Sequence, residues 1–511
     1  MVASGNKITR MDKRNAVRKA EKEIRREAVI KSNCRKSDRN IANRKSEFLT
    51  GEGVMEDRFK VATDTLKVYT RYLPGILKDL SEIKDPRNLK KKSHKLSMLL
   101  LYGIFSFVYH MSSRRDTDSE MTAVFMENMK EFFPEFDRLP HSCTLARLLK
   151  DINVMNIEEA AVKLIKRLIK DKKFVNYLIN KNYVIVIDGV HKFTREWEWC
   201  ENSLQKHKKG QPEGVNQYYA TVLEASFVLP EGLTIPFMSE FMDRKKYKDE
   251  GADTEKQKQD CELKAFKRLA DRLKKYFPHL KIALTLDGLY ANGPLMDLCQ
   301  RYGWDYIIVL KDGSLKTVWE DIEGLKKEGL VEKYTAPIKN GVKQEFWWVN
   351  NIDYRYGDNK SNKVKINVVV CEESYTCIDS KTGQEVEKTG KFAWISFREI
   401  TVRNVEKRCN NMGRPRWNIE TQNLVEKYHG YAYTHCFSYN WDAMKGYHYL
   451  MHLGHIMNIL TLYSTDIIER VRNKGARRVI KLIWETFDGN ILDVKRLKME
   501  IQGKYQIRLA V

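Results

Sequence analysis

Two short stretches of the chain share one pattern, an apolar run of strand length that ends in Asp-Gly. Residues 183–187 precede Asp188 and Gly189, and residues 281–286 precede Asp287 and Gly288. Val, Ile and Leu runs of this length, bounded by a turn signal, indicate strands that are buried on both faces of an α/β sheet. A carboxylate at the end of such a strand lies at the edge where open α/β sheets bind their ligands.

If the two strands are neighbours, Asp188 and Asp287 lie side by side. Two carboxylates that close repel each other, so a proton or a cation must relieve the repulsion. A divalent metal ion does so and also activates phosphate esters. Each Asp taken alone is more simply explained as the cap of a following turn. The matched pair, together with a third acid farther along the chain, favours a metal site.

The charge of the chain indicates a polyanionic partner. The sequence has 91 Lys and Arg and 68 Asp and Glu among 511 residues, so its formal net charge is +23. Such an excess is typical of proteins that bind nucleic acid or an anionic membrane surface. The sequence has no run of 18 apolar residues, so we expect no membrane-spanning helix and no membrane partner. Its nine cysteines are scattered without a C-x-x-C pair, which argues against zinc knuckles and disulfides and favours a reducing cytoplasm.

The composition divides the chain into segments. Residues 1–52 form a basic arm, expected either to lie along DNA phosphates or to act as a solubilising tail, because the first 50 residues carry 15 Lys and Arg and 6 Asp and Glu. Residues 53–180 show amphipathic helical spacing and basic edges, which predicts a helical DNA-binding domain. The remaining segments are a catalytic core in two parts, 181–325 and 399–465, a β-rich insertion between them, 326–398, and a basic tail, 466–511.

The core is predicted to contain a mixed sheet. Besides the two Asp strands, the predicted elements are strands at 217–228, 233–242 and 305–310 and helices near 256–276 and 293–302. An antiparallel meander followed by parallel crossovers predicts an α/β fold. Residues 331–397 contain strand signals separated by Asn, Gly, Asp and Ser turns, so the insertion is predicted to be all β.

A third acid lies in a helix that is predicted to begin with Pro415 in its first turn. At about 100° per residue, the side chains of Arg416, Glu420 and Lys427 leave one face of this helix. Asn423 lies between them. A carboxylate flanked by two cations suits a metal-bound phosphodiester, because the acid completes the metal site and the cations hold phosphate oxygens. By itself, the pattern is more typical of an ion pair on a solvated helix face.

The two Asp strands and the glutamate helix together resemble one enzyme family. The chain resembles DDE transposases of the bacterial insertion-sequence type, which have a ribonuclease-H-like core and a glutamate in the motif Y-x2-R-x3-E-x6-K. Arg416, Glu420 and Lys427 match this motif without a gap, whereas Gly413 occupies the tyrosine position. The strand order and the β-rich insertion before the glutamate helix also match that group, and the resemblance covers about residues 180–460.

The resemblance implies a ribonuclease-H-like fold and an active site formed by Asp188, Asp287 and Glu420. These residues would hold two Mg²⁺ ions, or Mn²⁺ in their place. They would cleave double-stranded DNA at transposon ends and transfer the freed 3′-OH into target DNA, in some relatives through an end hairpin. A homodimer that joins two ends, and a bacterial, cytoplasmic and nucleoid-associated location, follow from the same analogy.

The resemblance also implies DNA-binding side chains around the acids. Arg416, Lys427 and Asn423 of the glutamate helix are candidates. In the family, the insertion supplies an aromatic side chain near a distorted base, and Trp347 or Trp348 is the candidate here. Neighbours in a strand face opposite sides, so at most one of the two would contact DNA, and packing of both in the insertion's core is the alternative.

Three histidines lie in an apolar helical stretch after the glutamate helix. His448, His452 and His455 are spaced i, i+4 and i+7, which places them on one helix face and is compatible with a metal site. No Glu or Cys stands among them in the sequence, so histidines of the core or histidines that face DNA are the favoured interpretation.

Two other functions stay open. A domesticated DNA-binding protein would keep the fold without catalysis, although all three acids are present. A metal nuclease acting alone would cut without strand transfer, and the basic arm and the β-rich insertion argue against it.

Overall fold

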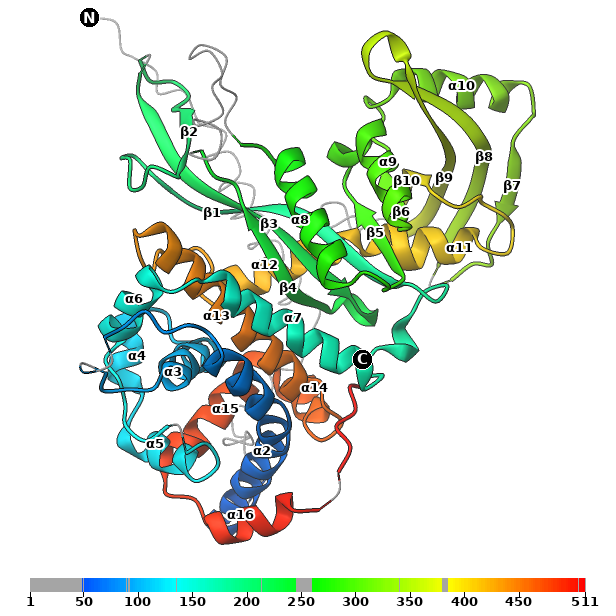
Figure 1. Ribbon diagram of the computed structural model, residues 1–511. Helices are drawn as coiled ribbons and strands as arrows, with labels where there is room; N and C mark the ends of the chain where they lie inside the picture. Colours follow the sequence, from blue (N-terminus) through cyan, green and yellow to red (C-terminus); the bar gives the residue numbers. More distant parts are fainter. Residues whose placement is uncertain are drawn as a thin grey trace, which may run out of the picture.

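The computed structural model describes residues 50–244, 260–378 and 385–510 together with Phe48, except for the single positions 89, 91, 135, 213, 340 and 504. It has a mixed α/β fold, with one large sheet and a body of helices (Figure 1), so the predicted α/β class is confirmed. Most of the predicted basic arm, residues 1–52, lies outside the described residues. Within the described ranges, none of the helices combines the length and the apolar character that a membrane crossing requires.

In the described part of the chain, ten strands form one continuous sheet. They are β1 (Tyr183–Arg195), β2 (Leu204–His207), β3 (Asn216–Val228), β4 (Thr234–Phe241), β5 (Ile282–Leu286), β6 (Asp305–Val309), β7 (Glu332–Thr335), β8 (Val342–Tyr356), β9 (Asn362–Ile378) and β10 (Glu385–Ser396). Their order is β2-β3-β1-β5-β6-β10-β9-β8-β7, and β4 pairs with β3. The pairs β1–β5 and β5–β6 are parallel, and the other pairings between these strands are antiparallel. The sheet is therefore mixed, as predicted.

The β-rich insertion extends this sheet and does not form a second one. β10 pairs with β6, with Ile395 opposite Ile308. β9, β8 and β7 follow outward in antiparallel pairings, and α10 (Lys316–Lys327) lies beside them (Figure 1). The insertion and the core therefore share one hydrogen-bonded framework.

The central strands are covered on both faces. Along β1, Val184 and Val186 pack toward a continuous helical run over residues 405–428. Ile185 and Ile187 belong to the main core on the opposite side. The helical run comprises α11 (Val405–Arg408), a π-helical turn (Cys409–Gly413), a 3-10 turn (Arg414–Trp417) and α12 (Asn418–Tyr428). The opposite face of the sheet is covered by α8 (Glu262–Tyr276) and α9 (Gly293–Tyr302). This alternation is what a strand buried on both faces requires.

The helical body is built from both ends of the chain. The N-terminal helices are α2 (Gly51–Ser81), α3 (Leu96–Val108), α4 (Arg114–Glu120), α5 (Ala123–Lys130), α6 (Ser142–Asp151) and α7 (Met155–Lys170); the C-terminal helices are α13 (Trp441–Leu462), α14 (Ile468–Lys474), α15 (Ala476–Gly489) and α16 (Val494–Ile501). α3 is buried over its whole length and packs against α13. The segment predicted as a basic tail, 466–511, contacts α2 through α15 and α16 and is part of this body.

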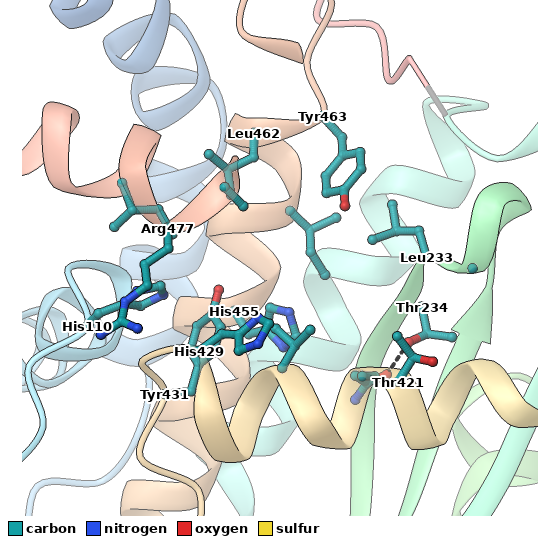
Figure 2. A pocket seen from close by; sticks show the side chains of 16 residues that line it. His110, Leu233, Thr234, Thr421, His429, Tyr431, His455, Leu462, Tyr463 and Arg477 are labelled. Atoms are coloured by element: carbon teal, nitrogen blue, oxygen red, sulfur yellow. Dashed lines mark hydrogen bonds between the residues drawn. The ribbon is translucent and has the colours of Figure 1, made fainter. Parts of the chain in front are cut away.

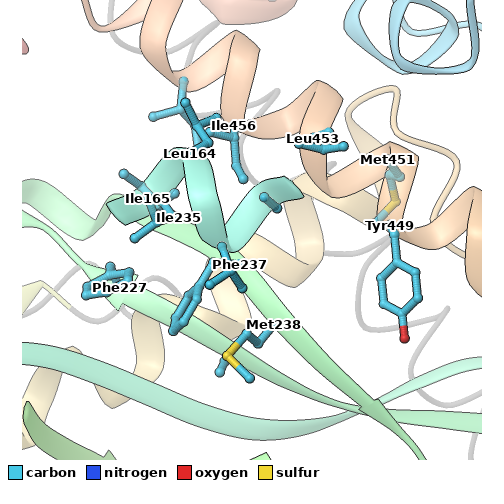
Figure 3. Close-up of a cluster of buried hydrophobic side chains, with 14 of the residues drawn as sticks. Leu164, Ile165, Phe227, Ile235, Phe237, Met238, Tyr449, Met451, Leu453 and Ile456 are labelled. Carbon is cyan, nitrogen blue, oxygen red and sulfur yellow. The ribbon is translucent and has the colours of Figure 1, made fainter. Parts of the chain in front are cut away.

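A hydrophobic layer joins the helical body to the sheet. It is formed by side chains of α7, α13, β3 and β4, among them Leu164, Ile165, Phe227, Ile235, Phe237, Met238, Leu453 and Ile456 (Figure 3). Each of these is at most 2% exposed. Burial of one such side chain contributes about 1.5–3 kcal/mol, so this layer fixes α13 and α7 against β3 and β4.

Candidate active site

Asp188 and Asp287 lie at the same level of two neighbouring strands. β1 and β5 pair in parallel with Ile187 opposite Leu286, and each Asp is the next residue of its chain. Side chains alternate along a strand, so Asp188 points to the same side as Val186, toward the helical run 405–428. The two aspartates are therefore neighbours beneath that run.

The glycine after each Asp makes room for a charged side chain. Neither glycine has a positive φ, and β1 continues through Gly189 to a length of 13 residues because β3 pairs along it. The predicted strand end at the first Asp-Gly is therefore wrong. A Cβ on Gly189 would lie 2.6 Å from Oε2 of Glu262, and a Cβ on Gly288 would lie 2.8 Å from Cγ of Lys311. These glycines let Glu262 and Lys311 approach the two aspartates.

The glutamate helix begins earlier than predicted. The backbone is helical from Val405 to Tyr428, and Pro415 lies in the 3-10 turn in the middle of this run. Proline removes an N–H group from a helix interior, and local π and 3-10 turns are the usual accommodation of such a defect. Glu420 follows in the first turn of α12.

Arg416 lies at the centre of the site. Its guanidinium nitrogens approach Glu420 at 2.6 Å, Asp188 at 3.6 Å and Asp287 at 4.0 Å. Arg416 is only 7% exposed, and its Nε has no hydrogen-bond partner among the described residues. The carboxylates themselves stay partly open to solvent, with side-chain exposures between 21% and 54%. Three acids from separate parts of the chain therefore converge on one cation.

Burial and charge act differently on the two aspartates. Burial raises the pKa of Asp188 to about 6, with Glu262 adding to the rise and Arg416 opposing it. Burial would raise the pKa of Asp287 as well, but a hydrogen bond from Lys311 Nζ at 2.8 Å, with further favourable charges, holds it below its usual range. Neighbouring carboxylates whose pKa values are pushed apart are typical of active sites.

Glu262 is a fourth acid beside the site that the sequence analysis missed. It lies in the first turn of α8, its Oε1 accepts a hydrogen bond from the Tyr290 hydroxyl at 2.7 Å, and its carboxylate packs on Gly189. A glycine inside a strand often marks the close approach of another group. That glycine is the signal that could have led to Glu262.

The other predicted residues of the glutamate helix lie farther along α12. The ammonium of Lys427 lies over the ring of Tyr433, 5.8 Å from its centroid. Asn423 is 7% exposed, and its Oδ1 has no hydrogen-bond partner in the described part of the chain. The structure therefore brings Arg416 to the acids and places Lys427 and Asn423 beyond them.

Trp347 and Trp348 point to opposite faces of the sheet, as expected for neighbours in a strand. Both faces are covered, so the two residues are 4% and 1% exposed. Trp347 donates its indole N–H to Glu372 at 3.0 Å, and the ammonium of Lys326 lies over its ring. Both tryptophans therefore pack in the interior, as the alternative to DNA contact expected. Neither presents a ring face for stacking on a base.

A cavity of about 280 Å³ adjoins the acids, and its aromatic lining was not predicted. Lys311 and Arg416 border it, together with Phe392, Trp394 and Trp417. Trp417 is 43% exposed, and its ring lies 5.8 Å from that of Phe392. The exposed ring of Trp417 beside Lys311 and Arg416 suits a nucleic-acid base and its phosphate, since stacking of one base contributes about 1–3 kcal/mol. Trp417 directly follows Arg416 in the sequence, a signal that the motif spacing did not include.

Gly413 occupies the tyrosine position of the motif, and close packing explains why this position has no side chain. A Cβ at this position would lie 2.8 Å from Nε1 of Trp394 and 3.2 Å from Cδ1 of Ile307. A larger side chain would therefore have to displace the indole that β10 packs against the helical run. The departure from the motif is part of how this chain joins its insertion to its core.

Comparisons with known proteins bear on the helical part of the chain. Residues 77–165 match a family model described as DDE_Tnp_1-associated, and this range runs from the end of α2 into α7. The match points to DDE-type transposases, and it does not include the acids. No curated protein matches the chain.

The raised pKa of Asp188 predicts that Asp188→Asn stabilises the metal-free protein. The folded pKa of about 6 lies above the usual value of 3.8, so ionisation of Asp188 increasingly destabilises the folded state as the pH rises from about 4 to about 6. The effect is fully present above pH 6 and fades as the pH falls below 4 and the unfolded state is protonated as well. We expect the variant to be more stable than wild type by about 1–2 kcal/mol at pH 7.5, after allowance for partial exposure.

This difference is measured by urea unfolding between pH 4 and pH 8. It should disappear toward pH 4, and added Mg²⁺ should reverse it by stabilising wild type more than the variant. Asp321→Asn, at an exposed position of α10, is the control and should follow wild type. A stability of Asp188→Asn below that of wild type throughout the range would contradict the prediction.

Proposed function

We propose that this protein is a DDE transposase, which cleaves double-stranded DNA at transposon ends and joins the freed 3′ strand to target DNA. The observation that carries the proposal is the convergence of Asp188, Asp287 and Glu420 on Arg416. The strand order, with parallel β1, β5 and β6 beside the antiparallel β3, supports a ribonuclease-H-like core. The match of the helical domain supports the transposase class.

The three acids have the donor set for hard divalent cations. All are carboxylates, and Mg²⁺ prefers oxygen ligands and leaves several positions to water and substrate phosphate. The guanidinium of Arg416 already provides a positive charge between the three acids. We infer that Asp188, Asp287 and Glu420 hold two Mg²⁺ or Mn²⁺ ions, which when bound would activate water and neutralise charge on the phosphate.

The cationic side chains of the site would hold the DNA phosphate. Arg416 presents a planar fork that matches two phosphate oxygens, and it would exchange its contacts with the acids for contacts with phosphate. Lys311, which now pairs with Asp287, provides a second positive charge on the side of the aromatic cavity. Trp417, which is 43% exposed, would stack a base displaced next to the cleaved bond. Lys427 would bind a phosphate farther along the strand.

The proposed reaction needs two DNA ends in one complex. We therefore infer a homodimer in the DNA complex, a bacterial cytoplasmic location close to the nucleoid, and a role of the basic arm 1–52 in binding phosphates. With its excess of positive charge, such an arm would add affinity that is independent of sequence and sensitive to salt.

The alternative functions differ in what they would do to DNA. A catalytically silent DNA-binding protein would bind the element's ends without cutting them. A stand-alone nuclease would cut without joining the cut strand to a second DNA. The complete set of acids favours an enzyme over the silent protein.

The test is incubation of the protein with Mg²⁺ and DNA that carries the ends flanking its own gene, followed by mapping of nicks and of joined products. We expect nicks that leave a 3′-OH at the end boundary, and joining of that strand to a second DNA. DNA with scrambled ends is the control. Binding without nicking would favour the silent DNA-binding protein, and nicking without joining would favour the nuclease.

A further inference from the structure

A buried polar cluster that includes none of the three acids lies between the sheet and the helices α12 and α13. It contains Glu224 of β3, Glu426 of α12, and His448 and His452 of α13, none more than 2% exposed. The sequence placed no acid among the histidines. The fold adds two acids to the histidines, Glu224 from β3 and Glu426 from α12. The cluster therefore has the composition of a metal site.

We propose that Glu224, His448 and His452 bind a divalent transition metal, with Zn²⁺ as the expected ion and Glu426 as the fourth ligand. Two imidazoles and carboxylates form a donor set that suits Zn²⁺. Mg²⁺ prefers sites built from oxygen alone, as the three acids around Arg416 are. The two sites would therefore select different metals.

The distances within the cluster fit one ion. Nε2 of His448 lies 3.2 Å from Oε1 of Glu224, and Nε2 of His452 lies 3.5 Å from Oε2 of the same carboxylate. Oε1 of Glu426 lies 3.9 Å from Nε2 of His452. Zn²⁺ bonds of about 2.0–2.2 Å in a tetrahedron separate the ligand atoms by about 3.4 Å. Small side-chain rotations would bring all four atoms to that separation.

The backbone holds these side chains in position without a metal. His448 and His452 are spaced i, i+4 in α13, so they leave the helix on one face. Glu224 lies opposite Asp188 in the pairing of β1 and β3, and residues directly opposite each other share a face of the sheet. The two histidines therefore meet Glu224 on the face of the sheet that Asp188 shares and that α12 covers.

The cluster has unused ligand capacity and unbalanced charge. Nε2 of His452 and Oε2 of Glu426 are buried without a hydrogen-bond partner among the described residues. The cluster has two carboxylates, and among the described side chains Lys192 is the cation in contact with it, 3.4 Å from Nδ1 of His448. Buried charges are normally paired or coordinate metals. With neutral imidazoles, a divalent cation would provide the missing positive charge.

Neighbouring side chains orient the ligands. Glu224 accepts hydrogen bonds from the hydroxyls of Ser239 at 2.8 Å and Tyr433 at 2.9 Å. Glu426 lies 2.7 Å from Nδ1 of His455. Metal-binding carboxylates and histidines are typically held by such outer hydrogen bonds. His455, which the sequence grouped with the other two histidines, would have this supporting role.

A path to the cluster exists. His455 and Tyr431 line a cavity of about 230 Å³ between α12, α13 and the loop before β4 (Figure 2). His455 contacts both this cavity and Glu426, so the cavity reaches the edge of the cluster. A metal ion could enter from this side without opening the sheet.

The proposed ion would fix the catalytic helix. Glu426 lies six residues after Glu420 in α12, and Glu224 is paired with Asp188. An ion shared by Glu224 and Glu426 would tie this helix to the strand next to the first catalytic Asp. The role would be structural, because the ion lies among buried side chains, whereas the carboxylates around Arg416 are partly open to solvent.

Metal analysis of the intact protein tests the proposal. After expression with zinc and dialysis, we expect one equivalent of Zn²⁺ per chain in wild type and in Glu420→Gln. His448→Gln and His452→Gln should bind Zn²⁺ at least about 100-fold more weakly, since loss of a supporting residue alone costs 10–100-fold. His279→Gln, at an exposed position, is the control and should retain the ion.

Substitution with Co²⁺ keeps the test decisive if a variant does not fold. Wild type should show the intense visible absorption of tetrahedral Co²⁺, and addition of Zn²⁺ should remove it and raise the melting temperature. Wild type without bound metal and with a melting temperature insensitive to Zn²⁺ would overturn the proposal. Equal metal content in His448→Gln and His279→Gln would overturn it as well.

Discussion

Replacement of Glu420 by glutamine should abolish DNA cleavage and leave binding of end DNA almost unchanged. Glutamine keeps the size of the side chain and removes the charge that would help to hold Mg²⁺. Loss of a single stabilising group in an active site costs about 10²–10³ in rate, and loss of a metal ligand should cost at least as much. Affinity for DNA rests mainly on Lys and Arg contacts to phosphate, so binding should stay equal or become slightly tighter.

The measurement is a gel-shift assay and a nicking assay on the same end DNA. Glu406→Gln is the matched control, because Glu406 is in the same helical run and accepts a hydrogen bond from Tyr334 at 2.7 Å, and this variant should cut like wild type. Cleavage by Glu420→Gln at the wild-type rate would show that Glu420 is not the third ligand. Glu262, the fourth acid beside the site, would then be the next candidate.

Replacement of Arg416 by alanine should weaken both DNA binding and cleavage, and it should also destabilise the metal-free protein. The guanidinium contacts all three acids, so its loss leaves three carboxylates with less compensation. Breaking a fully buried ion pair costs about 3–5 kcal/mol, and we expect about 2 kcal/mol here because the acids are partly exposed. Cleavage should fall about 10²–10³-fold.

Urea unfolding with and without Mg²⁺, and DNA titrations over a range of salt concentrations, measure these effects. Mg²⁺ should restore part of the lost stability, and the salt dependence of DNA binding should decrease by about one phosphate contact. Arg414→Ala removes the same charge two residues away, where the guanidinium pairs with Glu373, and should leave the acids unaffected. An unchanged salt dependence in Arg416→Ala would show that Arg416 does not bind phosphate.

Local sequence patterns were sufficient where the structure depends on local interactions. The helix predicted near 293–302 is α9 (Gly293–Tyr302), because Asn292 caps its start and Gly303 ends it in the left-handed conformation. The aspartates were found because a buried strand followed by a carboxylate is a local pattern. The two aspartates are neighbours because β1 and β5 pair in parallel with Ile187 opposite Leu286.

Features that depend on distant partners could not be predicted. β1 continues past Asp188 because β3 pairs with it, and the sequence of β1 alone contains only the Asp-Gly signal. Glu262 reaches the site from α8, and Glu224 and Glu426 reach the histidines of α13, across separations that no spacing rule covers. Trp347 and Trp348 were candidates for DNA contacts because the sequence does not show that both faces of their strand are covered.

The pairing of β10 with β6 has a mechanical consequence. Phe392 and Trp394 belong to β10, and β10 is joined through β6 and β5 to the strand of Asp188. The aromatic cavity and the carboxylates are thus parts of one stiff scaffold, with no hinge between them in the described strands. DNA that occupies both must bend and unstack to fit a fixed separation, so the cost of deformation falls on the nucleic acid. Ends whose terminal base steps open easily should then be processed faster than equally well bound ends that resist opening.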